Sequence, residues 1–288
     1  MYKNWLSPGV KYMLFASFVF SIMNVAVKKV SHIPSVEVVF FRALISLFMS
    51  WVYLQRNEIP KWGNNKKVLL LRGLFGTIAL IMVFATFQNM PLASAVVIHY
   101  LSPIFTALLA LIVLKERLFR VQYLFFALCF LGILLIKGFD FRISSLYFLL
   151  GICGAFLAGC AYVSIRVLKE SEHPLVIVFY FPLVAMPLTG IISYFFWVTP
   201  VGTDWLWLLL VGVLTQIAQV YLTKAYQVET AAVVANVNYV GIFYALIFGY
   251  IFFGETFSNE VIGGMMLVLA GVLLNVSFKK IKWLKNLG

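Results

Sequence analysis

Two pairs of a polar and an aromatic residue, His99–Tyr100 and Asn238–Tyr239, lie near the middle of two long apolar segments, one in each half of the chain. Each pair is followed by an element that loosens a helix, Ser102–Pro103 in the first case and Gly241 in the second. An imidazole, amide or phenol without a partner costs several kcal/mol in hydrocarbon. These groups therefore either line a polar cavity and bind a small substrate, or join two helices by hydrogen bonds worth about 1 kcal/mol each.

Four further polar residues occupy apolar segments and are candidates for the same cavity. Asn24 and Tyr162 lie past the middle of their segments, and Gln216 and Gln219 are three residues apart, on one face of a helix. Their amide and phenol groups can bind a polar substrate, and the alternative is that they hydrogen-bond to neighbouring helices. We include all four among the candidate substrate-binding residues.

Arg42 is a charged residue about two turns inside an apolar segment, where a guanidinium costs about 2.5–3.5 kcal/mol if it is central. We count it as a candidate ligand for an anionic group of the substrate. Arg42 can instead be structural, bonded to backbone carbonyls or paired with Glu37. Arg72 and Lys224 lie close enough to the cytoplasmic ends of their segments to extend their side chains to the membrane surface.

The composition of the chain requires lipid as the solvent of these segments. Of 288 residues, 63% are hydrophobic and 11% are charged, against about one quarter charged in a soluble domain. The net charge of +12 comes from short clusters between the apolar segments, which favours contact with anionic lipid and argues against a nucleic-acid partner. Cys129, Cys153 and Cys160 lie inside apolar segments and are expected to pack rather than to form disulfides.

Ten apolar segments have about the length, roughly 20 residues, that a helix needs to cross about 30 Å of hydrocarbon. Because backbone polar groups in lipid must be satisfied within the segment, all ten are predicted to be helices. The sequence thus predicts an all-α integral membrane protein. Its ten transmembrane helices are expected at residues 9–30, 35–55, 68–88, 92–114, 119–137, 144–168, 175–197, 204–226, 230–252 and 258–279.

The distribution of lysine and arginine predicts the orientation of these helices. With the N-terminus in the cytoplasm, the cytoplasmic ends collect seventeen basic residues and the outer ends four, with Arg42 left inside a span. Membrane proteins carry an excess of basic residues on the cytoplasmic side. Both termini are therefore predicted to be cytoplasmic.

The chain repeats itself when it is shifted along its own sequence so that Tyr100 falls on Tyr239. This single shift, the repeat register, also places Glu116 on Glu255, each at the end of an apolar segment. The two halves, residues 9–137 and 144–279, would hold five segments each, and because five is odd the second half enters the membrane in the opposite direction. The predicted architecture is two inverted five-helix repeats, with the two glutamates fixing helix packing at opposite faces.

Several stretches resemble one transporter family. "FFRALISL" (40–47) carries a basic residue, "IHYLSPIFTALLALIVLKERL" (98–118) is a proline-bearing fourth segment, and "FGYIFFGETF" (248–257) echoes its end. With the two five-helix halves, these stretches are similar to the EamA branch of the drug/metabolite transporter superfamily, over nearly the whole chain. The second half departs from the pattern, because Ile242 stands where Pro103 stands in the first. The resemblance implies secondary or facilitative transport of small metabolites, with the pathway between the halves.

A membrane enzyme or an ATP-driven pump has little support in the sequence. The aspartates, Asp140 and Asp204, fall in outer loops, the three histidines are too scattered for a metal motif, and no G-x-x-x-x-G-K-[ST] loop occurs. We therefore expect no catalytic residues, no metal and no cofactor. A channel or a receptor-like protein stays open as the alternative, although an inverted repeat favours alternating access.

The candidate cavity mixes amide, phenol, imidazole and at most a few cations. This mixture suits an amino-acid-like, nucleoside-like, aromatic or carboxylated metabolite better than a lipid. No carboxylate lies at mid-membrane, and His99 can titrate near neutral pH, so coupled transport, exchange and facilitated diffusion all stay open. We expect a monomer or homodimer in the cytoplasmic (inner) membrane of a bacterium, with the lipid bilayer and a small-molecule substrate as its partners.

Overall fold

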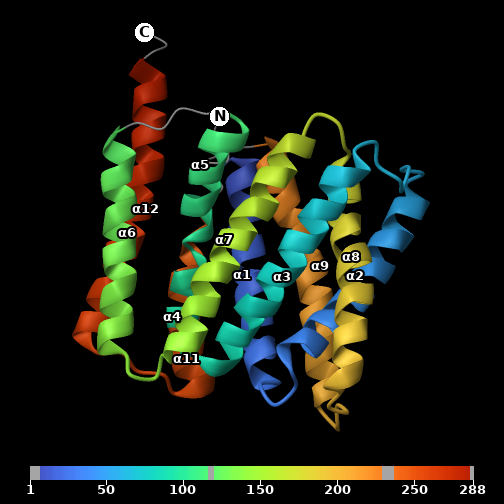
Figure 1. The fold of residues 1–288 in the computed structure, drawn as a ribbon, viewed down its shortest axis with the longest axis horizontal. Helices are drawn as coiled ribbons and strands as arrows, with labels where there is room; N and C mark the ends of the chain where they lie inside the picture. The colour runs from blue at the N-terminus through green and yellow to red at the C-terminus, as the bar shows by residue number, and fades with distance from the viewer. Residues whose placement is uncertain (1–6, 116–119, 229–236, 286–288) are drawn as a thin grey trace, which may run out of the picture.

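The computed structural model describes residues 7–115, 120–228 and 237–285, and all regular structure within these ranges is α-helical (Figure 1). The helices are α1 (Pro8–Lys29), α2 (Ser35–Arg56), α3 (Lys66–Asn89), α4 (Leu92–His99), α5 (Ser102–Val113), α6 (Arg120–Phe139), α7 (Ser145–Leu168), α8 (Pro174–Phe195), α9 (Asp204–Val228), α11 (Val240–Phe253) and α12 (Asn259–Lys285).

Eight segments of the described chain are long and apolar enough to cross a membrane, when α4 and α5 are taken as one segment. The helix α11 and residues 259–271 of α12 are apolar but shorter. The predicted all-α membrane fold is thus found. The number of ten spans stays a prediction, since part of the predicted segment 230–252 falls outside the described residues.

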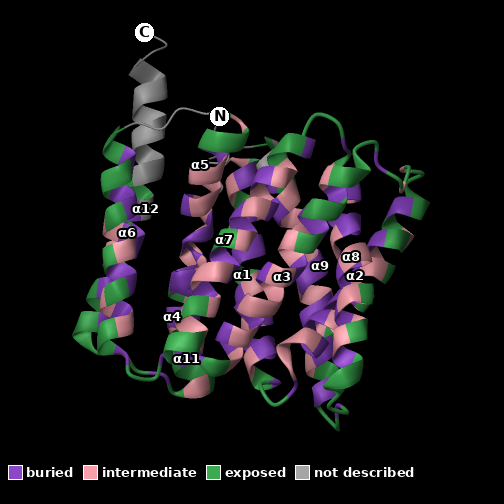
Figure 2. Ribbon diagram, viewed as in Figure 1, coloured by how far each residue is buried: buried purple, intermediate pink, exposed green. Residues whose placement is uncertain are grey.

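Large apolar side chains remain exposed along the outer helices. Leu134 of α6, Ile191 of α8 and Phe195 at the end of α8 are 60%, 66% and 72% exposed (Figure 2). Buried positions lie along the helix faces that meet inside the molecule. A surface of this kind is covered by lipid in a membrane protein, which agrees with the composition of the chain.

Polar residues at the connections determine where the helices begin and end. The Ser7 hydroxyl accepts a hydrogen bond from the Val10 amide at 3.3 Å, and the Ser144 hydroxyl accepts one from the Tyr147 amide at 3.3 Å. Both serines cap the first turn of a helix, whose amides have no partner within the helix. The helix α11 ends at Gly254, whose φ of +62° is in the left-handed region that favours glycine.

Within the described residues, two turns lie at positions that correspond in the repeat register, one between α4 and α5 and one directly before α11. Between α4 and α5 the chain turns at Tyr100 and Leu101, and Pro103 follows in the first turn of α5, where its missing N–H does no harm. The second turn is at Tyr239, directly before α11. It forms without a proline, and Gly241 follows it.

Each of the main helix pairs joins one helix from before residue 140 with one from after residue 144. The four most extensive pairs are α1 with α9, α2 with α8, α3 with α7, and α6 with α12, and the contacts of α5 with α7, α2 with α9, α3 with α8, α1 with α11 and α4 with α11 follow the same rule. In Figure 1, α6 and α12 stand at the left edge of the molecule and α2 and α8 stand at the right. The two parts of the chain are therefore interleaved and do not form separate domains.

The pair α6–α12 is held together through glycines that let the two backbones approach closely. A Cβ atom at Gly132 would lie 2.6 Å from the Gly264 carbonyl oxygen, and one at Gly264 would lie 2.8 Å from the Gly132 carbonyl oxygen. A Cβ atom at Gly271 would lie 2.8 Å from the Phe125 carbonyl oxygen. Close backbone approach through small residues is a main source of helix association in membranes.

Substitution of the neighbouring glycines in α12 tests this contact. Gly264→Ala should destabilise the protein by about 1–3 kcal/mol, because backbone atoms of α6 occupy the space that the new methyl group needs. Gly263→Ala is the matched control, since nothing lies within 4 Å of a Cβ atom there and alanine favours the helix by about 1 kcal/mol. Thermal unfolding in detergent should show a lower Tm for the first variant only. An equal Tm for both would contradict the close α6–α12 contact.

Candidate substrate cavity

A cavity of about 170 Å³ lies in the interior, between α1, α2, α3, α4, α7, α8 and α9. Its wall includes most of the residues that the sequence marked as candidates, namely Asn24, Arg42, His99, Tyr100, Tyr162, Gln219 and Asn238. Substrate binding by these residues stays a prediction, but the fold brings them from six separate segments to one polar space.

Two arginines face this cavity from neighbouring helices. Arg42 of α2 and Arg72 of α3 are each 6% exposed. Their guanidinium carbons lie 4.9 Å and 4.8 Å from the ring centroid of Phe181 on α8, within the range of a cation–π interaction. Both charges therefore reach the same aromatic ring.

The two guanidinium groups keep donors without a partner among the described residues. Arg42 donates from Nε to the Thr215 hydroxyl at 3.1 Å, while its Nη1 has no hydrogen-bond partner there. Arg72 has none at Nε or at Nη1. An ion pair between Arg42 and Glu37, one of the two structural alternatives, is not found among the described residues. One oxygen of the Glu37 carboxylate accepts from the Val198 amide at 3.0 Å, and the other has no partner there. No carboxylate is among the described residues that line the cavity.

The position of Arg72 corrects the expectation that its side chain extends to the membrane surface. It points inward, where its helix presents Gly76, Ala79 and Val83 to the same cavity. These residues follow Arg72 at intervals of four, seven and eleven, which is the spacing of one helix face. The helical spacing of Gly76 and Ala79 after Arg72 was the signal in the sequence that could have predicted this direction. The same face of α3 also presents Leu80, Phe84 and Phe87, and no local pattern in the sequence marks Phe181 as the ring that both arginines contact.

The two polar–aromatic pairs meet at the interruptions of the helices. The Tyr100 hydroxyl donates to the Asn238 carbonyl at 2.8 Å, and the rings of Tyr100 and Tyr239 pack edge to face with centroids 4.9 Å apart. The Asn238 side chain accepts from the Ser17 hydroxyl at 3.2 Å. Tyr239 is 1% exposed and is not part of the cavity wall, contrary to the prediction that all four residues face the cavity.

One buried ring nitrogen of His99 has no hydrogen-bond partner in the part of the chain that the structure describes. No hydrogen bond to its Nδ1 is formed by the described residues, although its ring lines the cavity. A buried polar atom of this kind is expensive in a membrane unless water or a ligand satisfies it. Together with the arginine donors, it makes the cavity a place where a polar ligand has bonds to form.

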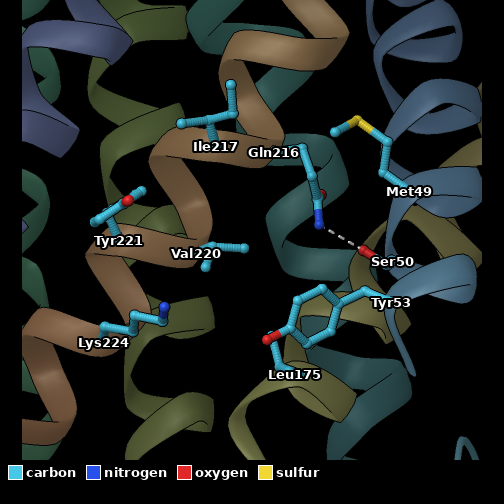
Figure 3. Close-up of a pocket in the computed structure, with 9 residues that line it drawn as sticks. All are labelled: Met49, Ser50, Tyr53, Leu175, Gln216, Ile217, Val220, Tyr221 and Lys224. Atoms are coloured by element: carbon cyan, nitrogen blue, oxygen red, sulfur yellow. Dashed lines mark hydrogen bonds between the residues drawn. The ribbon is translucent and has the colours of Figure 1, made fainter. Parts of the chain in front are cut away.

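The glutamines of α9 lie on two different cavities, although the sequence predicted one. Gln219 lines the central cavity, whereas Gln216 lines a second hollow of about 260 Å³ between α2, α8 and α9. In that hollow the Gln216 amide donates to the Ser50 hydroxyl at 2.8 Å, and most of the other walls are apolar side chains (Figure 3). Lys224 is exposed beside this hollow, in agreement with its predicted surface position.

A network of charges joins the end of α1 to the connection between α11 and α12. Lys28 forms an ion pair with Glu255 and donates to the Met90 carbonyl at 2.6 Å. Glu255 also accepts from the Leu92 amide at 2.8 Å, so it caps the beginning of α4. Glu255 thus fixes packing at a helix end, as predicted; Glu116 lies outside the described residues.

A second pair of charges lies beside this network, in the connection between α6 and α7. Arg142 donates from Nε and Nη2 to the two carboxylate oxygens of Asp140, at 2.8 Å and 3.0 Å. The pKa of Arg142 is raised, chiefly because these hydrogen bonds stabilise the charged guanidinium. This bidentate ion pair is the geometry that a guanidinium adopts with a neighbouring carboxylate.

The geometry can be compared with that of known proteins. The model of the EamA-like transporter family matches residues 7–138 and 145–277. This chain belongs to that family. The two matches meet at the connection between α6 and α7, so each covers one of the two interleaved sets of helices.

Relatives of this EamA protein are membrane transporters. The pseudopaline exporter CntI of Pseudomonas aeruginosa is 33% identical over 279 residues, which cover 96% of this chain and 98% of the exporter. Solute carrier family 35 member G1 of Mus musculus is 29% identical, over an alignment that covers 91% of this chain and 76% of the solute carrier. An S-adenosylmethionine uptake transporter of Rickettsia prowazekii is 23% identical, over an alignment that covers 96% of this chain and 95% of the transporter.

A solved crystal structure has the same fold as this EamA protein. It superposes with a TM-score of 0.70 at 16% identity and covers 96% of this chain and 98% of the other. The helix arrangement described above is therefore one that an experimentally determined protein adopts.

Replacement of the buried charge on α3 tests whether Arg72 is structural. Arg72→Met should leave the stability of the ligand-free protein unchanged or raise it by about 1–4 kcal/mol, because it removes a buried charge without a counter-charge. Arg56→Met, at an exposed position, serves as the control. Thermal unfolding in detergent measures both. A large fall in Tm for Arg72→Met alone would show that this arginine holds the fold together.

Proposed function

We propose that this protein is a secondary or facilitative transporter that moves a small polar or amphipathic metabolite across the membrane by alternating access. The observation that carries the proposal is the central polar cavity, whose walls come from both family repeats of a membrane protein. Substrate sites of carriers with internal repeats lie near the middle of the membrane, between the repeats.

Contacts between equivalent residues support the predicted inverted repeat of two sets of five helices. Tyr100 packs on Tyr239, and the Cys129 thiol donates to the Val268 carbonyl at 3.5 Å; the two members of each pair are equivalent in the repeat register. A residue close to a two-fold axis touches its own equivalent, as in a symmetric dimer. Two such places indicate an axis that relates the two halves.

The glycine contacts between α6 and α12 are also related by the repeat. The approach of Gly132 to Gly264 is repeated by the approach of Gly271 to Phe125, and the repeat register converts each contact into the other. The helix pair α1–α9 likewise corresponds to the pair α7–α3. A molecule built this way can adopt two pseudo-symmetric conformations of similar energy, in which the two halves exchange their shapes.

The ion pair between Lys28 and Glu255 supports a carrier rather than a channel. It ties the end of α1 to the connection after α11, across the two repeats. The bias of basic residues predicts that this end of the bundle faces outward, with both termini in the cytoplasm of a bacterium and the protein in its inner membrane. We propose that this pair acts as a latch, a contact that breaks when the cavity opens at this end, as a cavity that opens to one side at a time requires.

The substrate classes that suit this cavity are amino-acid-like, nucleoside-like, aromatic and carboxylated metabolites. Phenol, amide and imidazole groups offer hydrogen bonds, and Phe20, Phe84 and Phe87 offer apolar surface. We propose that the protein acts as a monomer or homodimer, without a cofactor.

Blocking the cavity tests the transport function. Purified protein in liposomes is supplied with a mixture of anionic, neutral and cationic metabolites, and mass spectrometry measures which ones enter the lumen. Val96→Trp should abolish entry of the carried compounds, because a large ring then fills the space between α4 and the other walls. Ile191→Trp, exposed toward lipid, should transport normally. Transport of no compound, or normal transport by Val96→Trp, would contradict the proposal.

Removal of the latch tests alternating access. Lys28→Gln leaves Glu255 without its counter-charge and should favour the conformation that is open at this end. A cysteine at Val96, with the three native cysteines replaced, should then react about ten-fold faster with an impermeant thiol reagent added from outside. Lys29→Gln is the matched control, since Lys29 stacks on Phe253 at 5.1 Å without an ion pair to the described residues. Equal labelling in both variants would contradict a latch.

A further inference from the structure

We propose that the substrate of the central cavity is a small organic dianion, with two carboxylate groups that bind to Arg42 and Arg72. This inference rests on the transport function proposed above and adds the chemical class of the cargo. The observation that supports the inference is an unbalanced positive charge in the interior. Two guanidinium groups are buried at one cavity, and no acidic side chain in the described part of its wall balances them.

The charge mismatch is large in physical terms. Arginine keeps its charge in proteins, and a buried charge without a counter-charge is among the least favourable arrangements in a membrane protein. Two such charges near one ring also repel each other. An anion that enters the cavity removes part of both penalties, and a dianion balances both charges, whereas a monoanion leaves one guanidinium unpaired.

Comparison with another arginine of the same protein shows what is missing. Arg142 binds both oxygens of Asp140 by two hydrogen bonds, at 2.8 Å and 3.0 Å. Among the described residues, Arg42 binds only a neutral hydroxyl through Nε, and Arg72 binds nothing through Nε and Nη1. The cavity arginines therefore have the donors that a carboxylate uses, without the carboxylate.

Phe181 holds the two guanidinium groups in place without occupying their donors. A cation–π contact is made with the ring face, so it leaves N–H groups of the guanidinium available for an anion. The contact also lowers the conformational freedom that the arginines lose when a ligand binds. The cavity is thus organised for an anion before the anion arrives.

The other polar groups of the wall fit the uncharged part of such a substrate. His99 has its Nδ1 free of partners among the described residues, and Gln219 and Asn24 contribute amides. A volume of about 170 Å³ suits a compact molecule. The two positive charges disfavour any substrate that carries a net positive charge.

The test compares small probes that differ in charge. Succinate should raise the Tm of the purified protein at millimolar concentration and should enter liposomes, whereas succinamide, its neutral diamide, should do neither. Putrescine, a dication, and glycerol phosphate, a phosphate dianion, complete the set. Mass spectrometry of the lumen and calorimetric titration give transport and affinity independently.

Variants of the two arginines connect binding to the cavity. Arg42→Gln and Arg72→Gln should each weaken succinate binding about ten-fold to a hundred-fold, because each removes charged hydrogen bonds. Arg72→Lys should recover part of the loss, since it keeps the charge but loses the two-pronged geometry. Arg56→Gln, at an exposed position, should bind succinate like the wild-type protein.

The outcomes separate the two proposals. If a neutral or cationic metabolite is carried and the arginine variants carry it normally, the dianion inference is wrong and the transport function stands. If glycerol phosphate binds and no dicarboxylate does, the assignment of carboxylates is overturned. If no compound of any charge is carried, the transport function itself fails.

Discussion

The hydrogen bond from the Tyr100 hydroxyl to the Asn238 carbonyl joins the break between α4 and α5 to the turn directly before α11. An interrupted helix leaves backbone groups without partners, and lipid offers none in exchange. The two interruptions are therefore stable only where they lie inside protein and satisfy each other. Gly241 makes this arrangement possible, because a Cβ atom there would lie 2.1 Å from the Tyr100 hydroxyl oxygen. His99 and Asn238 stand directly before these two turns, and both line the cavity.

Three pairs of charged or titratable groups lie at the helix ends and differ from the cavity arginines in that each group has a partner of opposite charge or a hydrogen-bond partner. Lys28 with Glu255, Arg142 with Asp140 and the His32 ring with Asp204 at 3.0 Å all lie near the same end of the bundle. These pairs hold helix ends together. The two cavity arginines are buried and have no such partner among the described residues, so structural pairing does not account for them. We therefore assign substrate binding to the cavity and the joining of helix ends, which includes the proposed Lys28–Glu255 latch, to these pairs.

The sequence was sufficient for the features that depend on regular spacing. The repeat register predicted that the pairs around Tyr100 and Tyr239 correspond, and the two rings touch. The position of a residue along a helix was less informative about the direction in which its side chain points. Arg72 is close enough to a helix end to reach the membrane surface, but its side chain lines the cavity and its guanidinium contacts the ring of Phe181. Gln216 and Gln219 share one broad side of α9, yet that helix separates two hollows and each glutamine faces a different one. Which neighbour lies opposite a given face follows from tertiary packing, and no local pattern encodes it.

The central claim is that the cavity between the two repeats is the site at which an anionic substrate is held by both arginines. A crystal structure or cryo-electron microscopy map of the protein with bound succinate tests this claim most directly. The account predicts ligand density in the central cavity, with one carboxylate in hydrogen-bond contact with Arg42 and the other with Arg72. Density in the hollow beside Gln216, or in the central cavity without contact to either guanidinium, would contradict it.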